Sequence, residues 1–377
     1  MRISDILKNN NPSKNPDEVP KDKQPVPPIN VPAHSAPVPS PVTAPVPART
    51  PVESAVSVPL DDDAADKTYA EAIIEIKNII SLFEKKEPYS KDIVSVTNIV
   101  RCIENQNQEL VMLADRATPD TYLIGHSVNA CILSVMIGHS LGLKTGELIS
   151  LGHCALLHDL GLADIQPLIL KKTKYTPAEL TNIQMHSLAT GTIVKGLPLL
   201  GEEIKALMIT VIGQVHERDN GSGYPFGMKN TDIHQFARII AIADVYESLT
   251  HPRPYRERIL PHNALKQMIS NEEYAFDTAL LKSFIEKISL YPPGSYVRLN
   301  TNEIGKVTET HMGLPTRPKV RMIIGSDLQR IPGTKIIDLV TTPMIFIKEA
   351  IDELALVIPD KKLMLELKAI RWWVRGL

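Results

Sequence analysis

Residues 123–160 read LIGHSVNACILSVMIGHSLGLKTGELISLGHCALLHDL, and this stretch sets the fold class. Its apolar residues recur at the three- and four-residue spacing of α-helices, with a break at Gly142 to Lys144. We therefore predict helices over residues 119–143 and 145–160. Runs with the same helical spacing cover residues 68–115, 176–195 and 201–216, and two more follow residue 261. The sequence predicts a mainly α fold, in the form of a helical bundle.

The two ends of the chain have other compositions. Of the 30 prolines, 14 lie in the first 59 residues, and proline without a backbone N–H does not build a packed core. We predict a disordered Pro-rich linker over residues 1–65. Residues 295–341 alternate β-branched residues with Asn and Gly turns, which predicts a small C-terminal β appendage. The last stretch, residues 343–377, is predicted to be helical, with an apolar face that packs on the domain or serves a partner.

Composition excludes several classes of protein. Lysine and arginine (41) nearly balance aspartate and glutamate (43), so no global basic field attracts DNA or an anionic membrane. We find no apolar run of the 18–20 residues that a membrane helix needs and no secretory signal profile at the start. The three cysteines cannot form a fully paired disulfide set. We expect no DNA partner, no membrane span and a cytoplasmic location.

Four histidines recur at intervals of 32, 28 and 30 residues, each within or at the end of a predicted helix: His126, His158, His186 and His216. Asp159 directly follows His158, and Asp244 lies inside the apolar stretch at residues 237–249. A single histidine on a helix is more often structural than a ligand. Imidazole and carboxylate together, however, suit divalent metals such as Fe, Mn, Co, Ni or Zn, and helices of a bundle bring such ligands together.

Polar clusters that interrupt apolar runs strengthen this prediction. Residues 215–230 read VHERDNGSGYPFGMKN, where a His-Glu pair directly precedes a Gly-Ser-Gly turn that has no use inside a helix. Residues 251–256 read HPRPYR. Such clusters cost stability unless they are satisfied or functional, so they indicate a site.

The ordered motifs resemble the HD-GYP family, a branch of the HD-domain metal-dependent phosphohydrolases. The residues that carry the resemblance are His126, His158-Asp159, His186, His216-Glu217, Gly221-Ser222-Gly223-Tyr224-Pro225, Asp244 and Arg253-Pro254-Tyr255-Arg256. The resemblance covers residues 119 to 289. It implies an all-α domain, a centre of two or three metal ions, often iron or manganese, and hydrolysis of cyclic di-GMP to pGpG and further to GMP.

The resemblance also implies a role for each matching residue. Its metal ligands would be His126, His158, Asp159, His186, His216 and Asp244, with His158 and Asp159 at the catalytic core and Asp159 as the bridge. Its substrate contacts would be Tyr224, Pro225, Arg253 and Arg256, the two arginines meeting the substrate phosphates. Glu217 would orient a neighbouring imidazole rather than bind metal.

Three positions depart from the family pattern. Val215 replaces a histidine, Tyr122 replaces the glutamate of three-metal members, and Leu162 replaces a lysine that contacts substrate phosphate. The expected centre therefore holds two divalent ions, most simply Fe or Mn. Lys171, Lys172 and Lys174 are candidates to replace the missing lysine. Val215 and Leu162 also leave open a degenerate module that binds nucleotide or a partner protein without turnover, and hydrolysis of another cyclic dinucleotide is a third possibility.

These observations divide the chain into four parts. They are a Pro-rich linker (1–65), an N-terminal helical region (66–118), an HD-GYP phosphohydrolase domain (119–290), and a β appendage with a terminal helix (291–377). The helices at 66–118 are candidates for a homodimer contact. The N-terminal segment is a candidate docking site for a partner protein.

Overall fold

The computed structural model describes residues 64–369 apart from 88, 90, 107, 115–121, 172, 198–200, 253–255, 272–273, 312 and 353–354. The N-terminal helices are α2 (Ala64–Glu84), α3 (Val94–Glu104) and α4 (Gln108–Leu113). The central helices are α5 (Tyr122–Ser140), α6 (Thr145–Leu157), the 3₁₀ helix η2 (Leu160–Ile165), α7 (Gln166–Ile169), α8 (Pro177–Gln184), α9 (His186–Lys195) and α10 (Glu202–Gln214). Then follow η3 (Asn230–Asp232), α11 (Gln235–Thr250), α12 (Pro261–Ser270) and α13 (Thr278–Ile288). The predicted mainly α fold is confirmed.

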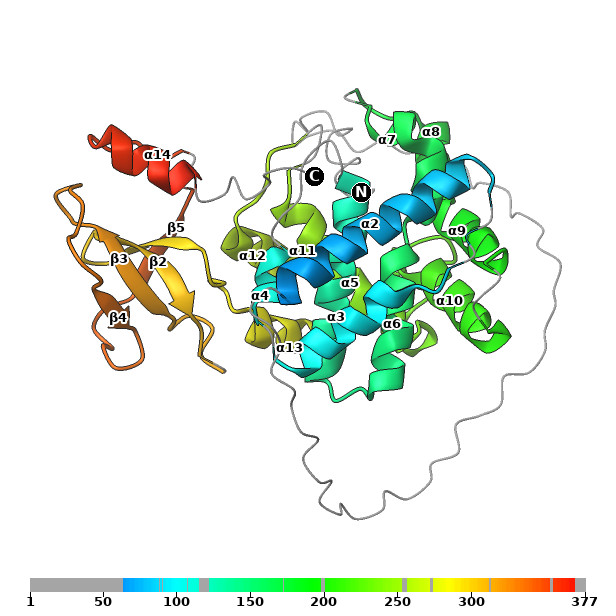
Figure 1. Cartoon of the computed structure of the whole chain (residues 1–377), viewed down its shortest axis with the longest axis horizontal. Helices are drawn as coiled ribbons and strands as arrows, with labels where there is room; N and C mark the ends of the chain where they lie inside the picture. Colours follow the sequence, from blue (N-terminus) through cyan, green and yellow to red (C-terminus); the bar gives the residue numbers. More distant parts are fainter. Residues whose placement is uncertain are drawn as a thin grey trace, which may run out of the picture. The chain divides into compact units, whose positions relative to one another are not determined.

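Two helices form the centre of the helical body. Every residue of α11 from Ile239 to Thr250 is buried, and α5 is buried on nearly all sides. A helix that is apolar all round is covered by others, and α5 packs against both α6 and α11. Figure 1 shows α2 and α3 running across these helices. The buried polar side chains of α5 and of α11 from Ile239 onward therefore have no access to bulk water and must bond to other protein groups.

The helix α2 lies outside this centre but is joined to it by packing and hydrogen bonds. Ala72, Ile76 and Ile79 are buried in the same core as α5. The Glu75 carboxylate accepts from the backbone N–H of Val94 at 3.2 Å and of Ser95 at 3.0 Å. Because the first N–H groups of a helix lack partners within it, Glu75 stabilises the start of α3.

The C-terminal part is an antiparallel sheet. Its strands are β1 (Tyr296–Leu299), β2 (Ile304–Glu309), β3 (Lys319–Ile324), β4 (Ile336–Asp338) and β5 (Ile347–Ile351), in the order β4-β3-β2-β1-β5. Helix α14 (Lys361–Ala369) contributes Leu363 and Leu367 to a core with Tyr296 and Ile304 of the sheet. This confirms the predicted β appendage.

One element of this region was predicted wrongly. The helical prediction over residues 343–377 fails at β5, where Tyr296 pairs with Ile351 and Val297 with Ala350. The backbone hydrogen bonds that β1 offers to residues 347–351 override the local helical spacing. Residues 370–377, which carry both tryptophans, and the linker predicted over 1–65 up to residue 63 lie outside the described part.

Two segments reach the length and mean hydropathy of a membrane helix, Leu123–Ser140 and Thr145–Ile169. These two runs are more apolar than expected, since the sequence predicted no apolar stretch long enough for a membrane helix. Within the body, however, 83% and 78% of their residues are buried. They serve as core helices of this fold.

Candidate metal centre

His126 on α5 and Asp244 on α11 face each other in the middle of the body. The His126 Nε2 atom lies 3.4 Å from Asp244 Oδ1 and 3.3 Å from Asp159 Oδ2. Both side chains are almost fully buried. The packing of α5 on α11 therefore brings together two groups that are 118 residues apart in the sequence.

Asp159 occupies the middle of the cluster. It follows His158 at the end of α6, and its Oδ1 atom lies 3.3 Å from His158 Nε2 and 3.1 Å from His186 Nε2. The His216 Nε2 atom, just beyond the end of α10, lies 2.9 Å from His186 Nε2. Among the described residues, two groups have the spacing to hold a metal ion: His126, His158 and Asp159, and Asp159, His186 and His216. Asp159 belongs to both.

Hydrogen bonds fix which nitrogen of each imidazole points into the cluster. The Nδ1 atoms of His158 and His186 lie 2.8 Å and 2.5 Å from the carbonyls of Ala155 and Ile183. Because a carbonyl only accepts, each Nδ1 carries the proton, and each Nε2 turns a lone pair towards Asp159. Lone pairs and a carboxylate converging in a buried volume fit a cation. The donor set, nitrogen and oxygen, suits a borderline divalent metal.

The backbone around His158 and His186 is held by Gly161 and Thr190. The Gly161 N–H donates to Thr190 Oγ1 at 2.8 Å, and this hydroxyl donates to the His186 carbonyl at 2.9 Å. A side chain at residue 161 would run into the His186 carbonyl oxygen. Glycine therefore permits the close approach that brings two candidate ligands together.

The segment at residues 216–228 forms a tight loop beside His216. The Glu217 carboxylate accepts from the backbone N–H of Phe226 at 2.7 Å and of Met228 at 2.9 Å. The ring of Tyr224 stacks on His216, with centroids 4.8 Å apart and planes 9° from parallel. Pro225 follows in the same loop and is half-buried. The described contacts thus attach Glu217 to the loop backbone, and Tyr224 to an imidazole of the cluster.

Only some of the predicted phosphate contacts lie among the described residues. Arg253 lies outside the described residues. Arg256 donates to the carbonyls of Ser248 at 2.5 Å and Leu249 at 3.2 Å, so its guanidinium caps the end of α11. Lys171 pairs with Glu179 at 2.8 Å, Lys172 lies outside the described part, and Lys174 is exposed.

The two apolar departures from the family pattern are core residues. Val215 is fully buried at the end of α10, and Leu162 is 1% exposed within η2. Both pack in the main apolar cluster of the body. At these two positions, apolar packing replaces polar groups next to candidate ligands.

Three residues that support the cluster were not predicted: Asn129, Glu247 and Thr190. Asn129 and Glu247 are three residues after His126 and Asp244, and Thr190 is four after His186. Residues three and four apart share a helix face, so this offset was a usable signal. The sequence does not show, however, that such neighbours bond to a ligand on another helix.

Burial favours the neutral form of two of the imidazoles, His158 and His216. It lowers the pKa of His158, and it lowers the pKa of His216 further, with the charge of His186 adding to the effect. For Asp159, burial raises the pKa, but electrostatic attraction from the neighbouring imidazoles, His158 first and then His126 and His186, outweighs it and holds the pKa well below its usual range. Neutral imidazoles around a carboxylate are the protonation state that a metal requires.

These shifts predict that the metal-free protein loses stability in mild acid. Below a pH of about 6.5, histidines of the unfolded chain take up protons that native His158 and His216 do not. The unfolding free energy should therefore fall with pH between 7.5 and 5.5, by up to roughly 1.4 kcal/mol per pH unit for each histidine. Denaturant melts in chelator measure this slope. A His158→Gln/His216→Gln variant with an unchanged slope would contradict the prediction.

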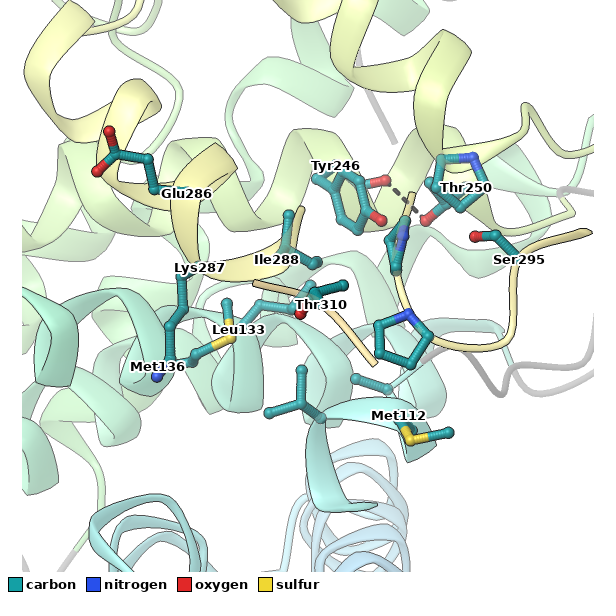
Figure 2. Close-up of a pocket in the computed structure, with 15 residues that line it drawn as sticks. Met112, Leu133, Met136, Tyr246, Thr250, Glu286, Lys287, Ile288, Ser295 and Thr310 are labelled. Carbon is teal, nitrogen blue, oxygen red and sulfur yellow. Dashed lines mark hydrogen bonds between the residues drawn. The ribbon is translucent and has the colours of Figure 1, made fainter. Parts of the chain in front are cut away.

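A separate cavity of about 190 Å³ is lined in part by residues of α4, α5 and α11. Figure 2 shows Met112 of α4, Leu133 of α5 and Tyr246 of α11 around it, together with Ser295 and Thr310 near the sheet. The Thr250 hydroxyl donates to the Tyr246 carbonyl at 2.9 Å. None of the candidate metal ligands is among its described lining residues. The metal cluster is thus a buried set of side chains, distinct from this cavity.

Comparisons with known proteins agree with this geometry. A family model described as an HD domain matches residues 101–280, and one described as a KOW domain associated with an HD domain matches residues 296–356. The cyclic di-GMP phosphodiesterase PA4108 of Pseudomonas aeruginosa is 30% identical over 218 residues, which are 58% of this chain and 51% of the relative.

Two further relatives have related names. The cyclic di-GMP phosphodiesterase PdeB of Borreliella burgdorferi is 29% identical over 56% of this chain and 58% of its own length. The 3'3'-cGAMP-specific phosphodiesterase 3 of Vibrio cholerae is 31% identical over 48% of this chain and 38% of its own. The chain thus spans about half the length of the curated relatives it matches.

The HD-domain match contains the clustered residues His126, His158, Asp159, His186, His216 and Asp244, and the Gly-Tyr-Pro sequence at residues 223–225 forms the loop beside them. Taken with the relatives, these features show that the chain belongs to the HD-GYP family of HD-domain proteins.

Proposed function

We propose that this chain is a metal-dependent phosphodiesterase that hydrolyses cyclic di-GMP to the linear dinucleotide pGpG, and further to GMP, at a dinuclear centre. The observation that carries the proposal is the convergence of two His/Asp groups on one carboxylate, Asp159. Two relatives with cyclic di-GMP phosphodiesterase in their names support this choice of substrate. The proposal places the reaction in the cytoplasm, with iron or manganese as the metal.

The residues have separate tasks in this proposal. His126 and His158 would hold one ion, His186 and His216 the other, and Asp159 would touch both. Asp244 lies 3.4 Å from His126 Nε2 and 3.9 Å from His216 Nδ1, so it would add negative charge to both groups. Divalent cations at such a site supply a Lewis acid that offsets negative charge developing on a phosphodiester.

The loop beside the cluster would position the substrate. Tyr224 stacks on His216 and so fixes that imidazole, while Pro225 and exposed Phe226 follow it. Glu217 holds this loop by its backbone. Arg253 is proposed to meet a substrate phosphate, and Arg256 could do so only after giving up its bonds to the end of α11.

A second candidate function follows from Val215 and Leu162. Both are buried apolar residues beside the candidate ligands, where they can neither bind metal nor contact phosphate. A chain with this packing could retain the fold and bind a nucleotide or a partner protein without hydrolysing it. The helices of the N-terminal region would then provide a homodimer contact, and the N-terminal segment a contact with a partner protein.

Metal content and turnover separate the two functions. We would purify the full chain without oxygen, measure metal by mass spectrometry, and follow cyclic di-GMP, 3'3'-cGAMP and a simple aryl phosphodiester with added Mn(II) or Fe(II). We expect two ions per chain and preferential conversion of cyclic di-GMP. Saturable nucleotide binding without product would favour the degenerate module. Faster turnover of 3'3'-cGAMP would show that this dinucleotide, rather than cyclic di-GMP, is the preferred substrate. One relative is named as specific for 3'3'-cGAMP.

A further inference from the structure

Four buried side chains connect helix α2 to His126. The Tyr69 hydroxyl on α2 donates to Asn129 Oδ1 on α5 at 3.0 Å. The Asn129 Nδ2 atom donates to Glu247 Oε1 on α11 at 3.2 Å, and Glu247 Oε2 bonds to His126 Nδ1. All four side chains are at most 9% exposed. The contacts join residues 60, 118 and 121 positions apart.

The chemistry of the four groups gives these bonds one direction. An ionised carboxylate only accepts, so Glu247 accepts a hydrogen bond from Asn129 Nδ2 and another from His126 Nδ1. The Asn129 amide must then turn its NH₂ to Glu247 and its carbonyl to Tyr69, whose hydroxyl donates. With Nδ1–H directed to Glu247, the Nε2 atom of His126 faces Asp159 and Asp244 at 3.3 Å and 3.4 Å.

Helix α2 lies outside the segment that matches the HD domain, residues 101–280. Its buried face nevertheless fixes the position of the Tyr69 ring, because Ala65, Ala72 and Ile76 around it are almost fully buried in the core. The hydroxyl of Tyr69 thus reaches Asn129 only when α2 is packed on α5 as observed.

We propose that Tyr69, Asn129 and Glu247 are positioning residues for His126, and that α2 is a structural part of the metal centre. The inference rests on the proposed function to the extent that His126 holds a metal. Hydrogen bonds to the far nitrogen of a ligating imidazole fix its ring orientation and raise its basicity, and their loss weakens metal binding. Displacement of α2 would lower the affinity for the ion at His126 more than the affinity for the ion at His186 and His216.

Cobalt binding to the metal-free full chain tests this without using turnover. Co(II) reports its ligands through visible absorption, and competition with a chelator gives the affinity of each ion. Glu247→Gln should lower the affinity for one of the two Co(II) ions about 10- to 100-fold and alter the absorption band of that ion. Tyr69→Phe should lower the affinity for the same ion roughly fivefold, which is the effect expected from the loss of one hydrogen bond.

Tyr89→Phe provides the matched control. Tyr89 is 8% exposed, and its hydroxyl also bonds to α2, at Glu75 Oε1 with 3.3 Å, but Glu75 leads to α3 rather than to His126. The two Tyr→Phe variants should lose similar thermal stability, while only Tyr69→Phe loses cobalt affinity. Equal affinity in both, or an equal loss in both, would overturn the role of α2.

The remaining outcomes separate this inference from the proposed function. If wild-type protein binds two Co(II) ions and hydrolyses cyclic di-GMP while Glu247→Gln binds cobalt as wild type does, the positioning role is wrong and the proposed function stands. If wild-type protein binds no Co(II), Mn(II) or Fe(II), both fail together.

Discussion

An Asp159→Asn variant is expected to lose both bound ions and at least about a thousandfold of its turnover. Asp159 is the one residue shared by the two candidate metal groups of the described chain, and it lies within 3.8 Å of all four imidazoles. An amide in its place keeps the shape but removes the negative charge that the two candidate metal groups share. Loss of ~4 kcal/mol of electrostatic stabilisation corresponds to a factor of about 10³ in rate.

The measurement combines metal analysis, turnover and thermal melting with and without Mn(II). Ligand binding raises the melting temperature only of a protein that binds the ligand, so the Mn(II)-dependent rise should be absent in the variant. Asp164→Asn is the matched control, because Asp164 lies five residues further on and is exposed. An Asp159→Asn protein that retained two ions and its activity would remove Asp159 from the centre.

A Gly223→Ala variant is expected to lose about a hundredfold in turnover and several degrees in melting temperature. The backbone of Gly223 does not need glycine, since its φ is not positive. Glycine is needed because there is no room for a side chain: a Cβ would lie only 2.5 Å from both Arg218 N and the His216 carbonyl oxygen. These are backbone atoms, so the loop itself must move, and Tyr224 would shift off His216. A misplacement of about 1 Å can cost 10²-fold in rate.

Gly146→Ala is the control for this second prediction. Gly146 is exposed in α6, and no atom lies within 4 Å of a Cβ there. Alanine should raise stability by up to about 1 kcal/mol, because it favours the helix more than glycine does. Turnover should be unchanged. A Gly223→Ala protein with normal turnover would show that the position of the loop does not matter for the reaction.

The sequence was sufficient to name six side chains that the structure brings together, namely His126, His158, Asp159, His186, His216 and Asp244. His126, Asp159 and His216 could be singled out because polar groups inside apolar helical runs are costly unless they serve a purpose. Their grouping was also predicted, because ligands on separate helices of a bundle converge in its core. Their assignment as metal ligands, like the domain boundaries, stays a prediction until metal is measured.

Strand β5 shows where local patterns are insufficient. Residues 347–351 have a spacing that favours a helix, yet they pair with β1, whose partner residues lie 48 to 55 positions earlier. A strand is stabilised by a partner whose position depends on the whole fold. Periodicity within the segment carries no information about that partner.

The amino-acid sequence by itself determined the helical class, the order of the candidate ligands and the Gly-Ser-Gly-Tyr-Pro loop, because each depends on side-chain chemistry and spacing along one segment. Only the tertiary structure decided that Glu217 holds the loop, that Arg256 caps α11, and that Tyr69 reaches His126 through Asn129 and Glu247. Buried polar groups must bond to whichever group helix packing brings near, and for His126 that group is 121 residues away.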